Sequence, residues 1–274
     1  MNLEILKRYN IKAKKSLGQN FLVNEKIIEE IANSVEVAGE NIVEVGPGYG
    51  ALTEKLLDKK PKSLVLIELD KDMIKVLESR IKDNDLKIKD VDFELRNENI
   101  LKFEPKFKEY SVIANIPYYI TSPILRHFLY DVKNTPDKML ILMQKDVGDK
   151  ILKGVKSEKG KMKSSVLSLF VAKQCFVQEV LFVGKQNFVP APKVESSVLL
   201  FEKHDLYSDI DDKKFLDLIK KGFKEPRKKL FKNFVTSGFD KESVSFVFRE
   251  LGIDEDIRGE DLDIKNWIKL VKKL

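Results

Sequence analysis

The stretch Glu44-Val45-Gly46-Pro47-Gly48-Tyr49-Gly50 separates two segments of different pattern. It begins within the short apolar run 42–46 and leads into the amphipathic segment 52–60. An apolar run of this length is typical of a buried strand, and the segment after it has the spacing of a helix. Glycines let the backbone turn sharply and approach a ligand closely, because they lack a Cβ. The stretch therefore predicts a strand, a ligand-binding turn and a helix in succession.

The alternation of strand and helix continues along the first two thirds of the chain. We predict further strands at 64–69, 91–96, 111–115 and 139–144, and helices at 71–82 and 122–132. Strands and helices that alternate at this spacing form a parallel sheet covered on both faces. Two later apolar runs, 175–183 and 196–201, have no long helix between them, so we expect an antiparallel pair at the sheet edge.

The last quarter of the chain has a helical pattern only. Amphipathic segments at 213–224, 228–236, 241–251 and 263–273 are separated by glycines, which commonly mark helix ends. The sequence therefore predicts two domains, an α/β domain at 1–204 and a small all-helical domain at 205–274.

Acidic side chains accompany the glycine-rich stretch. Glu68 and Asp70 end the second predicted strand, and Glu68 stands about 20 positions after Gly46, where a carboxylate binds ribose hydroxyls in nucleoside-binding folds. A nicotinamide dinucleotide would place its pyrophosphate near Glu44, which is an unfavourable pair of negative charges. S-adenosylmethionine has no phosphate and carries a sulfonium and an amino group. The acids therefore favour S-adenosylmethionine over a nicotinamide dinucleotide.

A second motif, Ala114-Asn115-Ile116-Pro117-Tyr118, ends the fourth predicted strand, at the carboxyl edge where α/β sheets bind ligands. The exocyclic amine of adenine is a poor nucleophile because its lone pair is delocalised into the ring. An Asn oxygen and a neighbouring backbone carbonyl can accept both N–H bonds and free this lone pair, while a tyrosine stacks on the base. The alternative interpretation is a proline turn with a capping Asn and a half-buried Tyr.

The charge of the chain is positive and unevenly distributed. Lys and Arg number 50 against 44 Asp and Glu, and the excess gathers at 1–26, 145–163 and 213–232. A single cluster would be an ordinary solvated surface, but three clusters favour a polyanionic partner such as nucleic acid. One cysteine and two histidines exclude a disulfide framework and lead us to expect no metal. Without a long apolar stretch or a secretory signal, we expect no membrane partner and a cytoplasmic location.

Several motifs together resemble those of the KsgA-type ribosomal RNA adenine dimethyltransferases. They follow the family's order from about residue 14 to residue 270. The most specific ones are Gly18-Gln19-Asn20-Phe21-Leu22 and Phe188-Val189-Pro190-Ala191-Pro192-Lys193-Val194. The others are the stretches 44–50, 67–70, 115–118, 121–125, 143–147, 227–229 and 258–262.

This resemblance implies a Rossmann-like S-adenosylmethionine-dependent methyltransferase domain with a small helical C-terminal domain. The implied reaction is dimethylation of adenine amines in small-subunit ribosomal RNA during ribosome assembly. Asn115 and the carbonyl of Ile116, at the Pro117 turn, would hold the target amine, and Tyr118 and Phe188 would sandwich the base.

The resemblance also assigns the residues that bind the cofactor and the RNA. Those expected to contact S-adenosylmethionine are Asn20, Leu22, Gly46, Gly48, Glu68, Asn99 and Asn115. Those expected to contact RNA in the small ribosomal subunit are Lys14, Lys15, Arg227, Lys228 and Lys229.

Three positions depart from the family pattern, and the alternatives to it remain open. Pro226-Arg227 stands where the family has paired arginines, so we expect one phosphate contact fewer. Asn99 stands where the family has an Asp that contacts the cofactor's adenine, so we expect weaker cofactor binding, and Tyr119 stands where the family has Asn. A large-subunit methyltransferase of the macrolide-resistance type is disfavoured by the 188–196 motif and the length of 274 residues. A non-enzymatic assembly or nucleic-acid-binding homologue is disfavoured by the complete 115–118 motif, and a nicotinamide oxidoreductase ranks third. A monomer is the default expectation.

Overall fold

The structure is a computed structural model that describes residues 2–155 and 163–274. The chain forms two compact units. The first comprises Met1–Gly148 and Gln178–Glu202, and the second comprises Asp149–Val177 and Lys203–Leu274. Within the described ranges, no helix is both long and apolar enough to cross a membrane.

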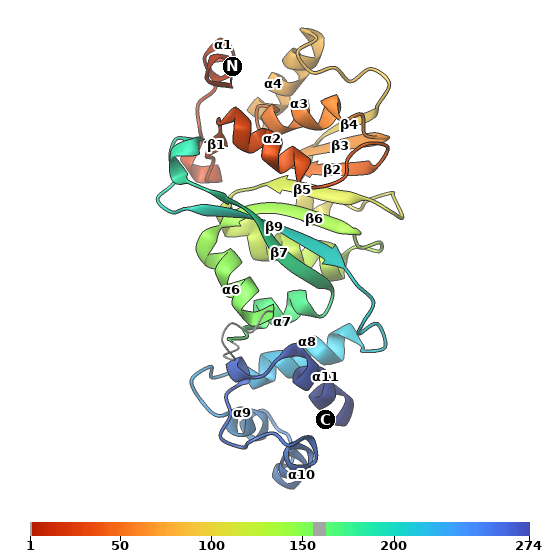
Figure 1. The fold of residues 1–274 in the computed structure, drawn as a ribbon, viewed down its shortest axis with the longest axis vertical. Coiled ribbons are helices and arrows are strands. Elements are labelled where there is room, and N and C mark those ends of the chain that lie inside the picture. The colour runs from red at the N-terminus through yellow and green to blue at the C-terminus, as the bar shows by residue number, and fades with distance from the viewer. Residues whose placement is uncertain (1, 156–162) are drawn as a thin grey trace. The chain divides into compact units, whose positions relative to one another are not determined.

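A seven-stranded sheet with the order β4-β3-β2-β5-β6-β9-β7 organises the first unit (Figure 1). The strands from β4 to β6 are parallel, and β9 runs antiparallel to β6. All five predicted strands of the parallel part are confirmed, and the predicted edge pair is β9 and β7. The bounds are β2 (Asn41–Val45), β3 (Ser63–Glu68), β4 (Asp92–Asn97), β5 (Ser111–Asn115), β6 (Lys138–Gln144), β7 (Cys175–Val183) and β9 (Ser196–Lys203).

The central strands are apolar on both faces because helices cover both faces of the sheet. Val43, Leu64, Leu66 and Ile113 have no exposed surface. Such continuous burial is the pattern of parallel strands in α/β proteins. The register places Val45 of β2 opposite Ile67 of β3 and Ala114 of β5. The segments that follow these three strands therefore leave the sheet at one edge.

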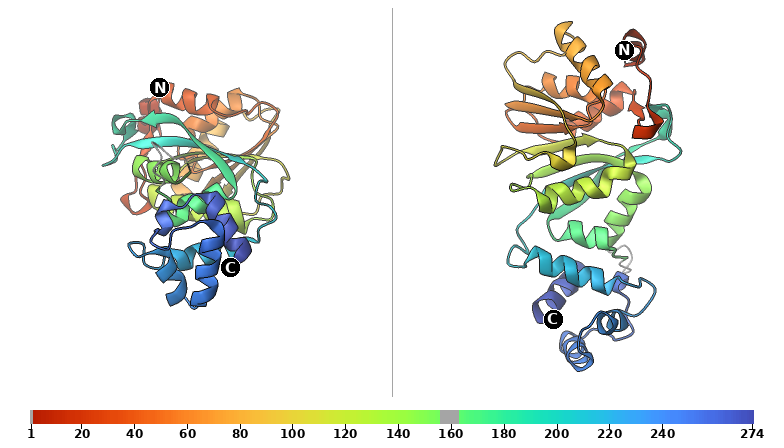
Figure 2. Two further views of the ribbon diagram at one scale, coloured as in Figure 1. Left: turned by 60° about the horizontal axis from the view of Figure 1, so that its bottom comes forward. Right: turned by 180° about the vertical axis from the view of Figure 1, so that it is seen from behind.

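Helices lie on both sides of this sheet. In Figure 1, α2 (Glu25–Asn33) and α3 (Ala51–Asp58) lie in front of it, and α5 (Thr121–Arg126) covers the opposite face in Figure 2. The helix predicted at 122–132 continues from α5 as a π-helical turn, η4 (His127–Asp131). The remaining elements are α1 (Asn2–Arg8), η1 (Lys15–Leu17), α4 (Lys71–Lys82), η2 (Ile100–Lys102), η3 (Tyr118–Ile120), α6 (Lys145–Val155) and η5 (Lys185–Asn187).

A second, two-stranded sheet joins the N-terminal segment to the turn before β9. Its strands are β1 (Phe21–Leu22) and β8 (Phe188–Val189), and they pair antiparallel with Leu22 opposite Phe188. The sequence did not predict this sheet, because two residues are too few to show a strand pattern. The pairing brings a predicted cofactor residue beside a predicted base-binding residue.

The second unit is built around Trp267, whose side chain is fully buried among Phe215, Phe234 and Phe248. Its C-terminal helices agree with the predicted segments. They are α8 (Asp212–Gly222), α9 (Leu230–Thr236), α10 (Lys241–Leu251) and α11 (Ile264–Lys273), with η6 (Gly259–Asp261) before the last.

An earlier part of the chain also belongs to this unit. Leu169, in α7 (Val166–Ala172), is part of the same hydrophobic core, and Ser164 Oγ donates a hydrogen bond of 2.7 Å to the Leu262 carbonyl. The helical unit therefore includes Asp149–Val177, a segment that sequence analysis placed in the α/β domain. The division of the chain into a methyltransferase domain at 1–204 and an RNA-contacting domain at 205–274 stays a prediction.

Candidate functional site

The glycine-rich turn lies against the end of β5. Gly46 and Gly48 adopt left-handed backbone conformations with φ of 69° and 57°. A Cβ on Gly46 would lie 2.9 Å from the Asn115 carbonyl oxygen, and one on Gly48 would lie 3.5 Å from the Phe21 ring. Only glycine fits at Gly46, because both the backbone angle and the approach of β5 exclude a side chain. The turn and the Asn115 motif are therefore adjacent, although they are separate in the sequence.

Glu68 ends β3 with its carboxylate held by two backbone donors. One oxygen accepts from the Gly48 N–H at 3.1 Å and the other from the Asp70 N–H at 2.8 Å. The side chain is 8% exposed. Burial raises the pKa of Glu68, and the hydrogen bonds oppose this effect only in part. Since each oxygen has a second lone pair, the carboxylate can still accept hydrogen bonds from a ligand.

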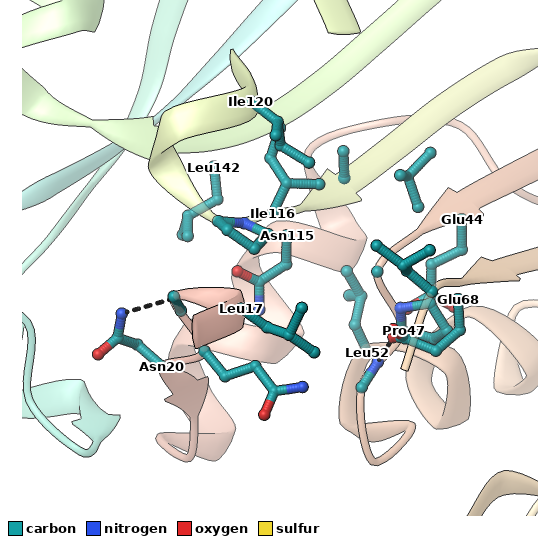
Figure 3. A pocket seen from close by; sticks show the side chains of 18 of the residues that line it. Leu17, Asn20, Glu44, Pro47, Leu52, Glu68, Asn115, Ile116, Ile120 and Leu142 are labelled. Atoms are coloured by element: carbon teal, nitrogen blue, oxygen red, sulfur yellow. Dashed lines mark hydrogen bonds between the residues drawn. The ribbon is translucent and has the colours of Figure 1, made fainter. Parts of the chain in front are cut away.

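Glu44 is a second acid beside Glu68, and it is almost completely buried. In Figure 3, Glu44 and Glu68 lie on the same side of the cavity. Thr53 Oγ1 donates a hydrogen bond of 2.8 Å to the Glu44 carboxyl. Burial raises the pKa of Glu44 to about 8, the Thr53 hydrogen bond lowers it, and the charge of Glu68 raises it. At neutral pH the Glu44 carboxyl is therefore mostly protonated.

The residues Asn115 to Tyr118 follow β5 into the cavity. Figure 3 shows the Asn115 side chain extending toward Leu17, with Glu44 and Glu68 on the other side. Ile116 is buried, and Pro117 precedes the turn η3. The Tyr118 hydroxyl forms a hydrogen bond of 2.7 Å with Ser196 Oγ, and burial raises the pKa of Tyr118.

The N-terminal segment forms another wall of the cavity. Asn20 donates a hydrogen bond of 3.2 Å from Nδ2 to the Gly18 carbonyl (Figure 3). The Tyr49 hydroxyl donates one of 2.7 Å to the carbonyl of Leu22, which is buried. Through the pairing of β1 and β8, this wall continues to Phe188, which is 3% exposed.

Asn99 lines the cavity and follows β4, the edge strand of the sheet. It caps the turn η2, where its Oδ1 accepts the Leu101 N–H at 3.0 Å. This oxygen has one lone pair left for a ligand. The position predicted to recognise the cofactor's adenine thus faces the cavity, but its acceptor is shared with the backbone.

One cavity of about 280 Å³ collects the predicted cofactor and base residues. None of the described residues that line it is Lys or Arg, whereas Glu44, Glu68 and Glu98 are among them. The role of the predicted residues in binding stays a prediction, but the fold brings them together. The predicted residues in the lining are Asn20, Leu22, Gly46, Gly48, Glu68, Asn99, Asn115, Ile116, Pro117, Tyr118 and Phe188.

Two of the residues predicted to bind RNA differ in their surroundings, although they are adjacent in the sequence. Lys14 Nζ lies 2.6 Å from carboxylate oxygens of both Asp70 and Asp72, whereas Lys15 is exposed. Gln19 Nε2 also donates to Asp70, at 2.7 Å. Partial burial raises the pKa of Asp70, but the hydrogen bonds from Lys14, Asp72 and Gln19 outweigh it, so that the pKa is lowered overall. Lys14 therefore anchors the N-terminal segment to the turn after β3.

The predicted RNA-binding residues of the second unit lie before and at the start of α9. Lys228 Nζ is 2.5 Å from Glu225, and Lys229 pairs with Asp256. Arg227 is exposed. These ion pairs lie on the surface, where they are weak, so they leave the lysines free to exchange partners. The third basic cluster, 145–163, lies partly outside the described residues.

Sequence reasoning missed the contacts that hold the walls of the cavity together. Tyr49, Gln19 and Ser196 lie within the recognised motifs, where the sequence assigns them no role, and each forms one of the hydrogen bonds described above. Their partners are distant in the sequence, so no local pattern could have identified them.

Comparison with known proteins identifies the family. The family model described as "Ribosomal RNA adenine dimethylase" matches residues 10–274. The chain belongs to this family. This confirms the resemblance and excludes the nicotinamide interpretation. As a member of the ribosomal RNA adenine dimethylase family, the protein is a methyltransferase that acts on adenine in ribosomal RNA with S-adenosylmethionine as methyl donor.

Relatives agree with this assignment, and two solved structures share the fold. "Ribosomal RNA small subunit methyltransferase A" of Mycoplasma mobile is 39% identical over 92% of this chain and 94% of its own length. The protein with the same description in Prochlorococcus marinus (strain MIT 9312) is 38% identical over 96% and 95%. In fold, the chain is similar to a dimethyladenosine transferase from Plasmodium falciparum, with a TM-score of 0.76, 23% identity and coverage of 91% and 95%. It is also similar to the 23S rRNA methyltransferase ErmE, with a TM-score of 0.70, 21% identity and coverage of 93% and 99%.

The chemistry of the cavity fits the family's methyl donor. When bound, S-adenosylmethionine supplies a methyl group on a positively charged sulfur. A lining with carboxyl groups and without Lys or Arg suits a cationic ligand, whereas a pyrophosphate would lack a counter-charge. The absence of a Cβ at Gly46 and Gly48 leaves room for a ligand beside the backbone. Glu68 would hold the ribose hydroxyls, and Gly46 and Gly48 would line the amino-acid end.

Proposed function

We propose that this protein converts adenines of small-subunit ribosomal RNA to N6,N6-dimethyladenosine during ribosome assembly. The observation that carries the proposal is that Glu68 and the Asn115–Tyr118 motif open into one cavity, so a methyl donor and an adenine can meet there. The small subunit is supported by the description of the relatives, two of which are 38% and 39% identical over nearly the whole chain. The cell compartment we propose is the cytoplasm, and the active form is a monomer.

Asn115 would increase the nucleophilicity of the target amine. The oxygen of its side chain and the carbonyl of Ile116 would accept the two N–H bonds of the adenine amine, so that the nitrogen lone pair points toward the methyl group. Bound S-adenosylmethionine would supply the methyl group, and the electron pair of its carbon–sulfur bond would stay on sulfur. Both acceptors are complementary to the positive charge that develops on nitrogen, which stabilises the transition state more than the ground state.

Tyr118 and Phe188 would hold the plane of the adenine. Both line the cavity, and both have a fixed position, Tyr118 through its hydrogen bond with Ser196 and Phe188 through the pairing of β8 with β1. Positioning of this kind supplies rate without a basic side chain. The newly methylated nitrogen is strongly acidic and loses its proton to water, which restores a neutral amine for the second methyl transfer.

Positive side chains would place the RNA. Lys15 in the turn η1 and Arg227, Lys228 and Lys229 in the helical unit are the candidates for contact with phosphates. Lys14 contributes indirectly in this proposal, because its ammonium is already paired with Asp70 and Asp72. The helical segment 205–274 thus serves RNA binding, and the α/β part serves chemistry.

Transfer of tritiated methyl groups tests the proposal. The purified protein is incubated with labelled S-adenosylmethionine and with small or large ribosomal subunits from a strain that lacks the methylation. We expect label in the small subunit only, and Asn115→Ala should lose most of this activity while its cofactor affinity in calorimetry changes only a few-fold. Label in the large subunit alone would instead support an enzyme of the macrolide-resistance type.

A further inference from the structure

An exposed aromatic side chain stands at the mouth of the cavity, directly after the predicted base-binding residue. Tyr119 lines the cavity and is 63% exposed. Within the described part of the chain, its hydroxyl forms no hydrogen bond. Tyr118, by contrast, is half-buried and bonded to Ser196. Two consecutive tyrosines therefore line one cavity, one half-buried and the other exposed.

The backbone of Gly18 supports the Tyr119 ring. A Cβ on Gly18 would lie 3.4 Å and 3.5 Å from two carbons of that ring, and 3.4 Å from Pro117 Cβ. Gly18 also has a φ of 62°, which disfavours any side chain at this position. The ring thus rests on backbone atoms on one side, while much of its surface remains open to solvent. It is a supported aromatic surface rather than a freely projecting side chain.

An exposed lysine lies in the turn that ends at Gly18. Lys15 is exposed, and its carbonyl accepts the Gly18 N–H at 3.0 Å within the turn η1. Among the described residues Lys15 forms no ion pair, whereas its neighbour Lys14 is paired with two aspartates. An open aromatic face with a nearby lysine is the combination with which proteins bind single-stranded nucleic acid, since the base stacks and the phosphate meets the cation.

We propose that Tyr119 is a second nucleotide subsite, on which the base adjacent to the target adenine stacks, with Lys15 near its phosphate. This inference rests on the proposed function and extends it. When the target adenine occupies the space between Tyr118 and Phe188, its covalent neighbour necessarily lies at the mouth of the cavity. Because every base has a π face, the subsite fixes the position of the RNA without selecting one base.

Three variants separate stacking from general effects of an exposed aromatic residue. Tyr119→Ala removes the ring, Tyr119→Phe keeps it, and Phe246→Ala removes an equally exposed ring, at 64%, from α10 in the other unit. We expect Tyr119→Ala to lower kcat/KM for small subunits about tenfold, which equals about 1.4 kcal/mol and lies in the range for one stacked base. Tyr119→Phe and Phe246→Ala should stay within about twofold of the wild type. Calorimetry should give all variants the wild-type affinity for S-adenosylmethionine.

A substrate without the neighbouring base provides the decisive comparison. Small subunits are reconstituted with RNA that carries an abasic nucleotide on either side of the target adenine. On one side, the abasic substitution should cost the wild type about tenfold and cost Tyr119→Ala nothing further, because the same contact is already missing. Two results would overturn the subsite while leaving the proposed function intact. One is that the losses from Tyr119→Ala and from the abasic nucleotide multiply, whichever side of the target adenine the abasic nucleotide is on. The other is a Tyr119→Ala variant with wild-type kcat/KM. A wild-type protein that does not methylate small subunits would instead overturn the proposed function, and the subsite with it.

Discussion

Glu44 couples the stability of the protein to pH. In the folded state burial raises its pKa to about 8, opposed in part by the Thr53 hydrogen bond and reinforced by the charge of Glu68, against an ordinary value of 4.5. Between these two pH values the unfolded chain has lost this proton and the folded chain still holds it. The folded state therefore binds more protons, and stability must fall as pH rises from about 4.5 to about 8.

The size of the effect follows from the two pKa values. Each pKa unit is equivalent to about 1.4 kcal/mol, so the difference between 4.5 and about 8 corresponds to at most about 5 kcal/mol at pH 8 and above. Glu44→Gln carries a neutral group of the same shape at every pH and can still accept the hydrogen bond from Thr53. We therefore expect the stability of Glu44→Gln relative to the wild type to increase by about 2–5 kcal/mol between pH 5 and pH 8.

Urea unfolding of the ligand-free protein at pH 5, 6.5 and 8 measures this difference. Glu40→Gln is the matched control, because Glu40 is an exposed carboxylate close to β2. Its stability should follow that of the wild type across the pH range. If Glu44→Gln and the wild type also changed in parallel, Glu44 would be ionised in the folded protein and this account of the cavity's charge would be wrong.

Three further substitutions test other parts of the account. Asn99→Asp should tighten cofactor binding about fivefold in calorimetry, since a charged acceptor forms the stronger hydrogen bond, and unchanged or weaker binding would contradict the placement of Asn99. Tyr49→Phe should cost about 1–2 kcal/mol in urea unfolding, because the buried Leu22 carbonyl loses its donor, and an unchanged midpoint would count against that bond. Reversal of residues 227–229 to Glu should weaken small-subunit binding about 100-fold and flatten its salt dependence. If this triple variant bound small subunits like the wild type, the three residues would be only a solvated surface. The matched control for this reversal is the exposed set Lys82, Lys87 and Lys89.

Where the predicted bounds of an element match the structure, local signals in the sequence explain the match. The helix expected at 71–82 and α4 have the same bounds, because Asp70 caps its first turn by accepting the Asp72 N–H. The strand expected at 111–115 and β5 also coincide, since the run of Val112, Ile113 and Ala114 is buried and ends at a polar Asn. Residues at the carboxyl ends of such strands meet at one edge, which is why Gly46, Glu68 and Asn115 could be expected together, whereas Asn20, Leu22 and Phe188 were expected only from the family resemblance.

Long-range contacts explain the rest. The apolar run around Leu169 does not show which core receives it, and the structure places it with Trp267. The pairing of Leu22 with Phe188 depends on two strands of two residues each. A run of lysines also has the same pattern whether a lysine is paired, as Lys14 is with Asp70, or exposed, as Lys15 is.

The most direct test of the central claim is the chemical identity of the product. Small subunits from a strain that lacks the methylation are treated with the protein and S-adenosylmethionine, and their ribosomal RNA is digested to nucleosides for mass spectrometry. We predict that N6,N6-dimethyladenosine appears in the RNA of these subunits with the wild-type protein and is almost absent with Asn115→Ala. Methylation confined to another base or to large-subunit RNA, or no methylation at all by a folded protein that binds the cofactor, would contradict the account.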